Sequence, residues 1–162
     1  MHTLIIYDTE YGNTQQIALA LAEAFKVHGS VRLVVATETG ETEMPDLQGV
    51  DLLVIGGPTQ IHGLSPAMRI LLKNIPTNTL SGLPVVTFDT RYRAATYISG
   101  SAAQAIAHEL KKEKALLLLP PKSFFVRGRE GPLEEDGEDN AARWVQTIMQ
   151  RYDVYRAKHA TV

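Results

Sequence analysis

The sequence predicts an α/β protein of three layers, in which a doubly wound, five-stranded parallel sheet carries helices on both faces. Short aliphatic runs, typical of strands buried on both faces, alternate along the chain with segments of helical periodicity. Such β-α-β alternation favours parallel strands joined by right-handed crossovers. The expected strands are residues 3–7, 31–35, 52–55, 85–88 and 115–119.

Four segments between and after these strands show helical patterns. In the first, Ile17, Leu21 and Phe25 are spaced four residues apart and form one apolar stripe. In the second, Ser65 and Pro66 form a typical N-cap followed by proline at the first helical position. The expected helices are residues 13–27, 66–73, 101–111 and a final one that starts near residues 137–139.

Two connections are expected to be irregular. Residues 35–51 are polar, contain Gly and Pro and show no clear helical stripe, so this crossover should be a loop or a very short helix. Pro120 and Pro121 should end the fifth strand, which residues 123–126 could resume. Because no linker or repeat divides the chain, we expect one domain, followed by a frayed tail at residues 156–162.

The composition excludes several functional classes. With 44% hydrophobic and 21% charged residues among 162, the chain resembles an ordinary soluble globular protein, and its net charge of −2 gives no general attraction to nucleic acid or anionic membranes. The absence of cysteine excludes disulfides, thiol catalysis and cysteine-ligated clusters. No apolar run could span a bilayer and no signal peptide is visible, so we expect a cytoplasmic location.

The turn after the first strand is the strongest candidate for a binding site, because ligands of parallel α/β sheets lie outside the carboxyl ends of the strands. Residues 7–14, YDTEYGNT, place Thr9, Gly12, Asn13 and Thr14 immediately before a helix. The unpaired N–H groups and the dipole of a helix N-terminus favour an anion. The turn contains no Lys or Arg, which suits a phosphate monoester held by neutral dipoles. The alternative is an ordinary connector in which these side chains only cap the helix.

The pattern IIYxTxxGxTxxxAxxL at residues 5–21 resembles the flavodoxin signature. Flavodoxins are the type example of strand order 2-1-3-4-5 with FMN at the switch point, so the resemblance implies this order, FMN as the cofactor and its phosphate in the first loop. It makes residues 1–155 a flavodoxin-like FMN-binding domain. Many flavodoxins carry a small hydroxyl residue where Tyr11 stands, although its backbone N–H remains available. The implied FMN-binding residues of this loop are Thr9, Glu10, Tyr11, Gly12, Asn13 and Thr14.

The loop after the third strand, GGPTQIHG at residues 56–63, resembles the flavin loop of flavodoxin-like proteins, including flavodiiron proteins and quinone reductases of the tryptophan-repressor-binding type. Backbone N–H groups of residues 59–62 are expected to face a flat polar heterocycle. The usual stacking aromatic is missing here, and an exposed loop imidazole is the alternative for His62. The resemblance places along the ribityl chain and the isoalloxazine edge Pro58, Thr59, Gln60, Ile61 and His62.

The loop after the fourth strand, residues 88–101, is longer than a βα connection requires and holds two Tyr and two Arg. In flavodoxins this loop supplies an aromatic that stacks on the flavin. A cation here, Arg91 or Arg93, would favour the anionic reduced flavin, or would bind a nicotinamide cofactor or an acidic partner. Solvated surface is the remaining alternative for both. The residues implied at the flavin are Asp89, Thr90, Arg91 and either Tyr92 or Tyr97.

The resemblance implies an FMN-binding electron-transfer protein that serves redox partner proteins or a small electron acceptor. Two alternatives stay open, because a fold does not fix a function. One is an FMN-dependent reductase of quinones or similar acceptors that uses NAD(P)H. The other is a binding or regulatory module that has lost FMN. The apolar face of the last helix, with Trp144 and Met149, is expected in the core or in the contact of a homodimer.

Overall fold

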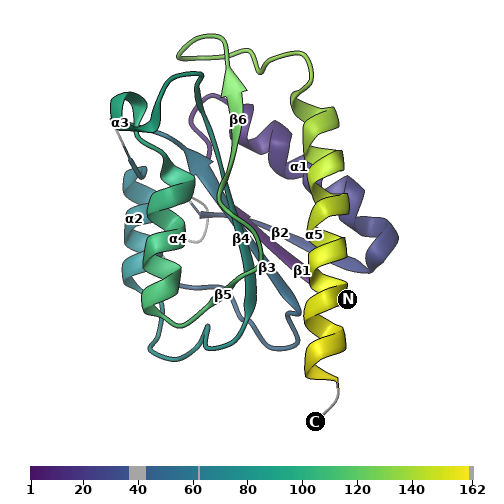
Figure 1. The fold of residues 1–162 in the computed structure, drawn as a ribbon. Coiled ribbons are helices and arrows are strands. Elements are labelled where there is room, and N and C mark those ends of the chain that lie inside the picture. The colour runs from purple at the N-terminus through teal and green to yellow at the C-terminus, as the bar shows by residue number, and fades with distance from the viewer. Residues whose placement is uncertain (37–42, 62, 161–162) are drawn as a thin grey trace.

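The computed structural model describes residues 1–36, 43–61 and 63–160 (Figure 1). The strands are β1 (His2–Tyr7), β2 (Ser30–Val35), β3 (Leu52–Pro58), β4 (Pro84–Tyr92), β5 (Leu116–Leu117) and β6 (Lys122–Val126). The helices are α1 (Asn13–Phe25), the short 3-10 helix η1 (Lys26–His28), α2 (Pro66–Lys73), α3 (Thr96–Ser99), α4 (Ala102–Lys112) and α5 (Gly137–His159).

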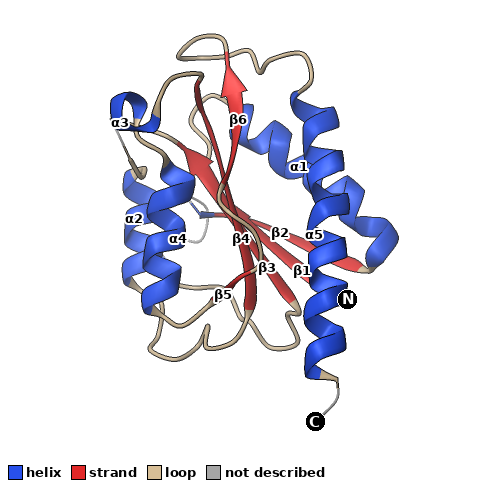
Figure 2. Cartoon of the chain, in the orientation of Figure 1, coloured by secondary structure: helices blue, strands red, loops and turns tan. Residues whose placement is uncertain are grey.

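The strands form one parallel sheet in the order β2-β1-β3-β4-β5, with β6 also paired to β4. The strand order expected from the resemblance is therefore confirmed. Helices α1 and α5 cover one face of the sheet, and α2 and α4 cover the other (Figure 2). This arrangement is the expected three-layer α/β architecture.

Alternate residues of the central strands supply two separate cores, because successive strand side chains point to opposite faces. In β1, Ile5 packs with α1 and α5, whereas Leu4 and Ile6 pack with α2 and α4. Central strands that are buried on both faces explain why the runs in the sequence are continuously aliphatic instead of alternating with polar residues.

The edge of the sheet beside β4 is divided in two. Val85 of β4 pairs with Leu117, and Phe88 pairs with Lys122, so the edge strand makes a detour between the two pairs. The detour contains Pro120, which has no N–H to donate to a ladder. The resumption of the strand near residue 123 is thus confirmed. Pairing with β6 also extends β4 as a strand to Tyr92, four residues beyond the predicted end at Phe88.

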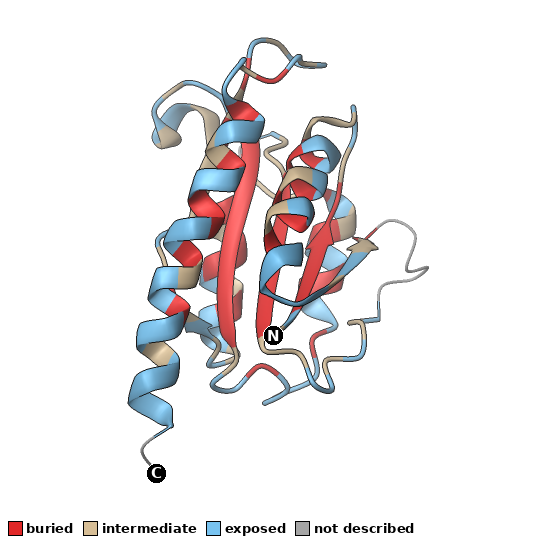
Figure 3. Ribbon diagram, turned by 90° about the vertical axis from the view of Figure 1, so that its right-hand side faces the viewer, coloured by how far each residue is buried: buried red, intermediate tan, exposed pale blue. Residues whose placement is uncertain are grey.

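The apolar face of α5 belongs to the core. Figure 3 shows the buried positions of this helix on the side that faces the sheet. Trp144 meets Phe88 and Phe124 edge to face, with ring centroids 6.0–6.4 Å apart. This face is therefore occupied within the chain and is not left for a dimer contact. The helix continues to His159, so most of the expected tail is helical.

The capping signals give the expected helix starts. The Ser65 hydroxyl accepts a hydrogen bond from the Met68 N–H at 3.1 Å, and Pro66 stands at the first position of α2. Within the described part of the crossover between β2 and β3, residues 43–51 contain no helix, as the polar sequence indicated. No helix in the described ranges is both long and apolar enough to cross a membrane.

Candidate functional site

A cleft of about 510 Å³ lies at the carboxyl ends of β1, β3 and β4. This volume falls within the usual range for small-molecule sites, and the position is where an open parallel sheet binds its ligand. The cleft unites the first loop, the second loop and the end of β4 with a fourth segment that follows β6. Its lining residues are Thr9, Glu10, Tyr11, Asn13, Thr14, Pro58, Thr59, Gln60, Ile61, Thr90, Arg91, Tyr92, Val126 and Arg129.

The first loop forms an open N-terminus of α1. Gly12 is the N-cap residue, with a φ of 89°, and its N–H donates to Thr9 Oγ1 at 3.0 Å. Among the described residues, no side chain caps this end, so the first-turn N–H groups keep their capacity for a ligand. Apart from its chain neighbours and the backbone of α1, no atom of the described residues lies within 4 Å of the position that a Cβ of Gly12 would take, so the backbone is accessible there.

Thr14 ties this helix end to the sheet. Its hydroxyl lies 2.7 Å from the hydroxyl of Thr90, and either oxygen can be the donor. Both residues are buried and both line the cleft. The anion site at α1 and the end of β4 are therefore fixed relative to one another.

The second loop uses its backbone groups differently from the sequence-based expectation. The Thr59 N–H donates to Thr90 O at 3.0 Å, and the Gln60 N–H donates to Gly63 O at 2.9 Å. These two N–H groups are thus bonded within the protein and do not face the cleft, which corrects the prediction for them. Ile61 stands at the tip of this turn, 98% exposed and with a φ of 38°. His62 lies outside the described residues.

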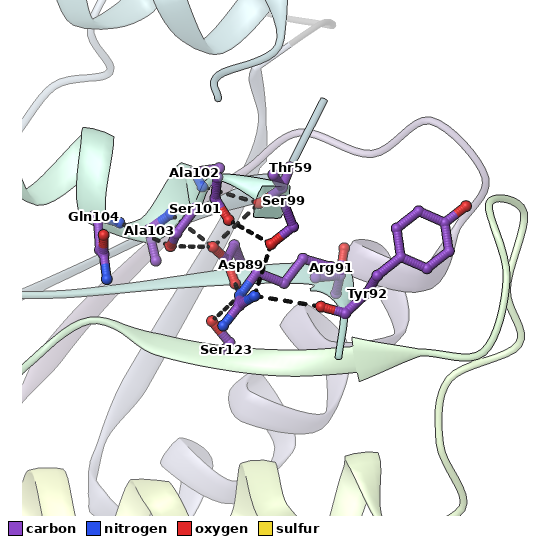
Figure 4. Close-up of polar contacts among 12 residues, drawn as sticks. Thr59, Asp89, Arg91, Tyr92, Ser99, Ser101, Ala102, Ala103, Gln104 and Ser123 are labelled. Atoms are coloured by element: carbon purple, nitrogen blue, oxygen red, sulfur yellow. Dashed lines mark hydrogen bonds and ion pairs between the residues drawn. The ribbon is translucent and has the colours of Figure 1, made fainter. Parts of the chain in front are cut away.

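Asp89 does not line the cleft but is fully buried beneath it. Its Oδ2 accepts hydrogen bonds from the Ser101 hydroxyl at 2.6 Å, the Ala103 N–H at 3.0 Å and the Thr59 hydroxyl at 3.2 Å (Figure 4). A carboxylate at the N-terminus of α4 is favoured by the helix dipole. The geometry therefore gives Asp89 the task of joining β4, α4 and the second loop.

The Arg91 guanidinium is hydrogen-bonded within the protein although this residue lines the cleft. Its guanidinium donates to Ser123 Oγ at 2.9 Å, Ala94 O at 2.7 Å and Ser99 Oγ at 2.9 Å, and its side chain is only 9% exposed. Its Nε also lies 3.9 Å from Asp89 Oδ1. These contacts clamp the segment after β4 onto β6, and the nearby carboxylate offsets the positive charge.

Arg93 points to the outside of the same edge. It forms two hydrogen bonds with Glu134, at 2.6 and 3.0 Å, and its guanidinium lies over the Phe125 ring, 4.1 Å from the centroid. The hydrogen bond from Arg93 holds the pKa of Glu134 below its ordinary value. Since both arginines of this segment are engaged in this way, neither presents a free cation to the cleft.

The two tyrosines of the third loop have different positions. Tyr92 lines the cleft, is 47% exposed and directs its ring away from the contacts of Asp89 and Arg91 (Figure 4). Tyr97, in α3, is 88% exposed and does not line the cleft. Of the two tyrosines of the third loop, Tyr92 is therefore the one that lines the cleft, where Tyr11 of the first loop also lies.

Comparison with known families decides the identity of this arrangement. A family model described as "Flavodoxin domain" matches residues 4–128. The chain belongs to the flavodoxin family. No curated protein sequence matches it.

Solved structures that resemble this flavodoxin agree in fold. An archaeal flavodoxin is 14% identical with a TM-score of 0.72, over 94% of this chain and 99% of that one. Oxidised Flavodoxin 1 from Bacillus cereus is 15% identical with a TM-score of 0.77, over 93% and 98%. The rubredoxin oxygen:oxidoreductase of Desulfovibrio gigas is 19% identical with a TM-score of 0.70, over 94% of this chain but 36% of that one.

Membership of the flavodoxin family implies FMN as the cofactor, and the cleft fits it. The open N-terminus of α1 around Gly12 provides neutral donors for a phosphate. Tyr11, Pro58 and Tyr92 provide apolar surface for a flat ring system. Within the described residues, no group of three or more His, Asp or Glu side chains could hold a metal ion.

Two cleft residues, Val126 and Arg129, were missed by the sequence-based reasoning. They lie at the end of β6 and in the loop that follows it. Their position depends on the pairing of β6 with β4 across the proline detour, a tertiary contact that no local pattern reveals.

Proposed function

We propose that the chain is a cytoplasmic electron-transfer flavodoxin that passes electrons to redox partner proteins or to a small electron acceptor. The observation that supports this most is the cleft itself, which combines a neutral anion site at the N-terminus of α1 with Tyr92 at the carboxyl end of β4. FMN supplies one- and two-electron redox chemistry when it is bound. The chain's own residues bind, orient and shield that group.

The first loop binds the phosphate of FMN in this proposal. The N–H groups at the start of α1 provide donors and a partial positive charge for the phosphate. Thr14 is held by the Thr90 hydroxyl, so this helix end keeps its position on the sheet without a ligand. A preformed site of this kind loses little ordering entropy when it binds.

The end of β4 and the contacts beneath it orient the flavin in this proposal. Tyr92 follows Arg91 directly, and the guanidinium of Arg91 holds the carbonyls of Tyr92 and Ala94 at 3.3 and 2.7 Å. Arg91 is therefore a positioning residue, which sets where the Tyr92 ring stands. Tyr92 and Ile61 are both exposed in part or in full, so the mouth of the cleft is open to an electron donor or acceptor.

The experiment is a flavin titration followed by reduction. The purified protein should show oxidised-flavin absorbance or gain it on addition of FMN. The bound FMN should then be reduced by dithionite and reoxidised by an added one-electron acceptor. A protein that neither contains nor binds FMN would contradict the proposal and favour a module without flavin. Sustained consumption of NADPH with a quinone would favour the reductase instead.

A further inference from the structure

We propose that Arg129, in the loop between β6 and α5, binds the phosphate group of FMN together with the N-terminus of α1. The first loop itself contains no Lys or Arg, so its sequence indicates a site without a cation. The fold changes that conclusion, because it brings Arg129 into the same cleft. The inference rests on the proposed FMN site and adds a residue to it.

The loop that carries Arg129 is attached directly to the start of α1. The side-chain amide of Asn13, the first residue of α1, donates to Glu130 O at 3.1 Å. Gly131 has a φ of 107°, and a Cβ there would come within 2.5 Å of Asn13 Oδ1, so the two segments are in close contact. Because Arg129 precedes Glu130, its Cα lies about 3.8 Å from that of Glu130, at the open helix end. Asn13 and Arg129 both line the cleft.

Arg129 differs from two nearby arginines, which are engaged in ion pairs with glutamates. Arg93 pairs with Glu134 at 2.6 Å, and Arg127 pairs with Glu135 at 2.9 Å. Arg129 forms no hydrogen bond or ion pair with any of the residues that the structure describes, although it is the arginine of this loop that lines the cleft. A cation left without a protein partner beside an anion site has its donors available for a ligand.

The chemistry of the two groups matches. A guanidinium is planar and can donate two parallel hydrogen bonds to phosphate oxygens, and such charge-assisted bonds are stronger than neutral ones. The remaining acid of the cleft, Glu10, accepts a hydrogen bond from the Gln60 amide at 2.6 Å. A phosphate at the N-terminus of α1 would have the N–H groups of the helix as neutral donors and Arg129 as its countercharge.

The test compares Arg129→Gln with wild type for two ligands, FMN and riboflavin, which lacks the phosphate. At low salt, the Kd for FMN should rise about tenfold, the value of one charge-assisted hydrogen bond, while the Kd for riboflavin should stay the same. The FMN effect should shrink at about 0.5 M salt, since the side chain is exposed and screened. Arg127→Gln is the matched control from the same loop, and it should leave both affinities unchanged.

Each other outcome overturns the inference. Equal losses for FMN and riboflavin would show that Arg129 supports the shape of the loop and does not contact the phosphate. Unchanged affinity for both ligands would make it a surface group. Should Arg129→Gln fold poorly, Arg129→Lys keeps the charge, and it should then retain most of the preference for FMN over riboflavin. If the wild type binds FMN no better than riboflavin, no phosphate site exists. If it binds neither flavin, the proposed function fails as well.

Discussion

Replacing Asp89 with alanine tests the assignment of this residue to the framework of the cleft. The fully buried carboxylate accepts three hydrogen bonds at Oδ2, from Ser101, Ala103 and Thr59. Alanine would leave the buried N–H of Ala103 unpaired, at a cost of about 1–3 kcal/mol. It would also leave the guanidinium of Arg91 without its carboxylate, and losing one partner of a buried ion pair costs about 3–5 kcal/mol.

Both costs come from removing the same carboxylate, so they are not expected to add in full. The Ser101 hydroxyl also still caps α4, because it accepts a hydrogen bond from the Gln104 N–H at 3.2 Å. Asp89 Oδ1 also has no hydrogen-bond donor among the described residues, so the native carboxylate is already imperfectly stabilised. We therefore expect Asp89→Ala to lower the free energy of unfolding by about 3–5 kcal/mol and not by the sum of the separate costs. Asp89→Asn, which keeps one acceptor oxygen, should cost about 1–2 kcal/mol.

The assay is urea denaturation followed by circular dichroism, with the free energy extrapolated to water. The control is Glu109→Gln, which removes an exposed pair with Lys112 in α4 and should cost no more than about 0.5 kcal/mol. A loss of less than about 1 kcal/mol in Asp89→Ala would refute the assignment. So would Asp89→Asn with unchanged stability but an altered flavin spectrum, since that result would place the carboxylate at the flavin.

Two further predictions concern the cleft, and a third concerns the ion pair on the outer edge of the sheet. Tyr92→Ala should weaken FMN binding about 2- to 10-fold in a fluorescence titration, the value of aromatic stacking, whereas a comparable loss in Tyr97→Ala would transfer that role to the other tyrosine. Gly12→Val should raise the Kd for FMN at least about tenfold, because a φ of 89° strains a β-branched residue, and an unchanged Kd would place the phosphate elsewhere. Since the pKa of Glu134 is lowered by Arg93, the stabilisation from this pair is present at neutral pH and is lost as the pH falls through that lowered value. Urea midpoints should therefore fall more for wild type than for Glu134→Gln between neutral pH and pH about 3, and parallel curves would contradict this.

Much of the fold follows from patterns that the sequence carries locally. The aliphatic runs and the helical stripes predict the strands and helices because strands buried on both faces cannot alternate with polar residues. Ser65 and Pro66 start α2 as expected, since capping depends on neighbouring residues alone. The first loop can be predicted from the sequence for the same reason, because Gly12 takes the conformation that the turn into α1 requires.

The third loop could not be predicted in the same way. Asp89 to Tyr92 follow an apolar run and look like the start of a loop, but pairing with β6, and with β3 as far as Thr90, makes them the end of a strand. Asp89 is buried beneath the cleft, whereas Thr90, Arg91 and Tyr92 line it at the end of the strand. Which residues do so depends on register with a strand more than thirty positions away, beyond the Pro120–Pro121 detour.

Contacts within the folded chain determine the charge of the cleft. Composition alone suggests Arg91 and Arg93 as cations near the flavin, yet each has an acidic partner: Asp89, in β4 itself, lies beside Arg91, and Glu134, in the loop after β6, pairs with Arg93. The Arg91 guanidinium, 3.9 Å from the buried Asp89 carboxylate, acts at a distance as part of a dipole and not as an isolated charge. The exposed Arg93–Glu134 pair is screened by salt within about 10 Å at 0.1 M ionic strength. The loop that neutralises Arg93 through Glu134 is also the one that carries Arg129 to α1. Among the described residues, the available positive charge of the cleft is therefore that of Arg129, at the end where the phosphate is expected, and not that of the arginines at the end of β4.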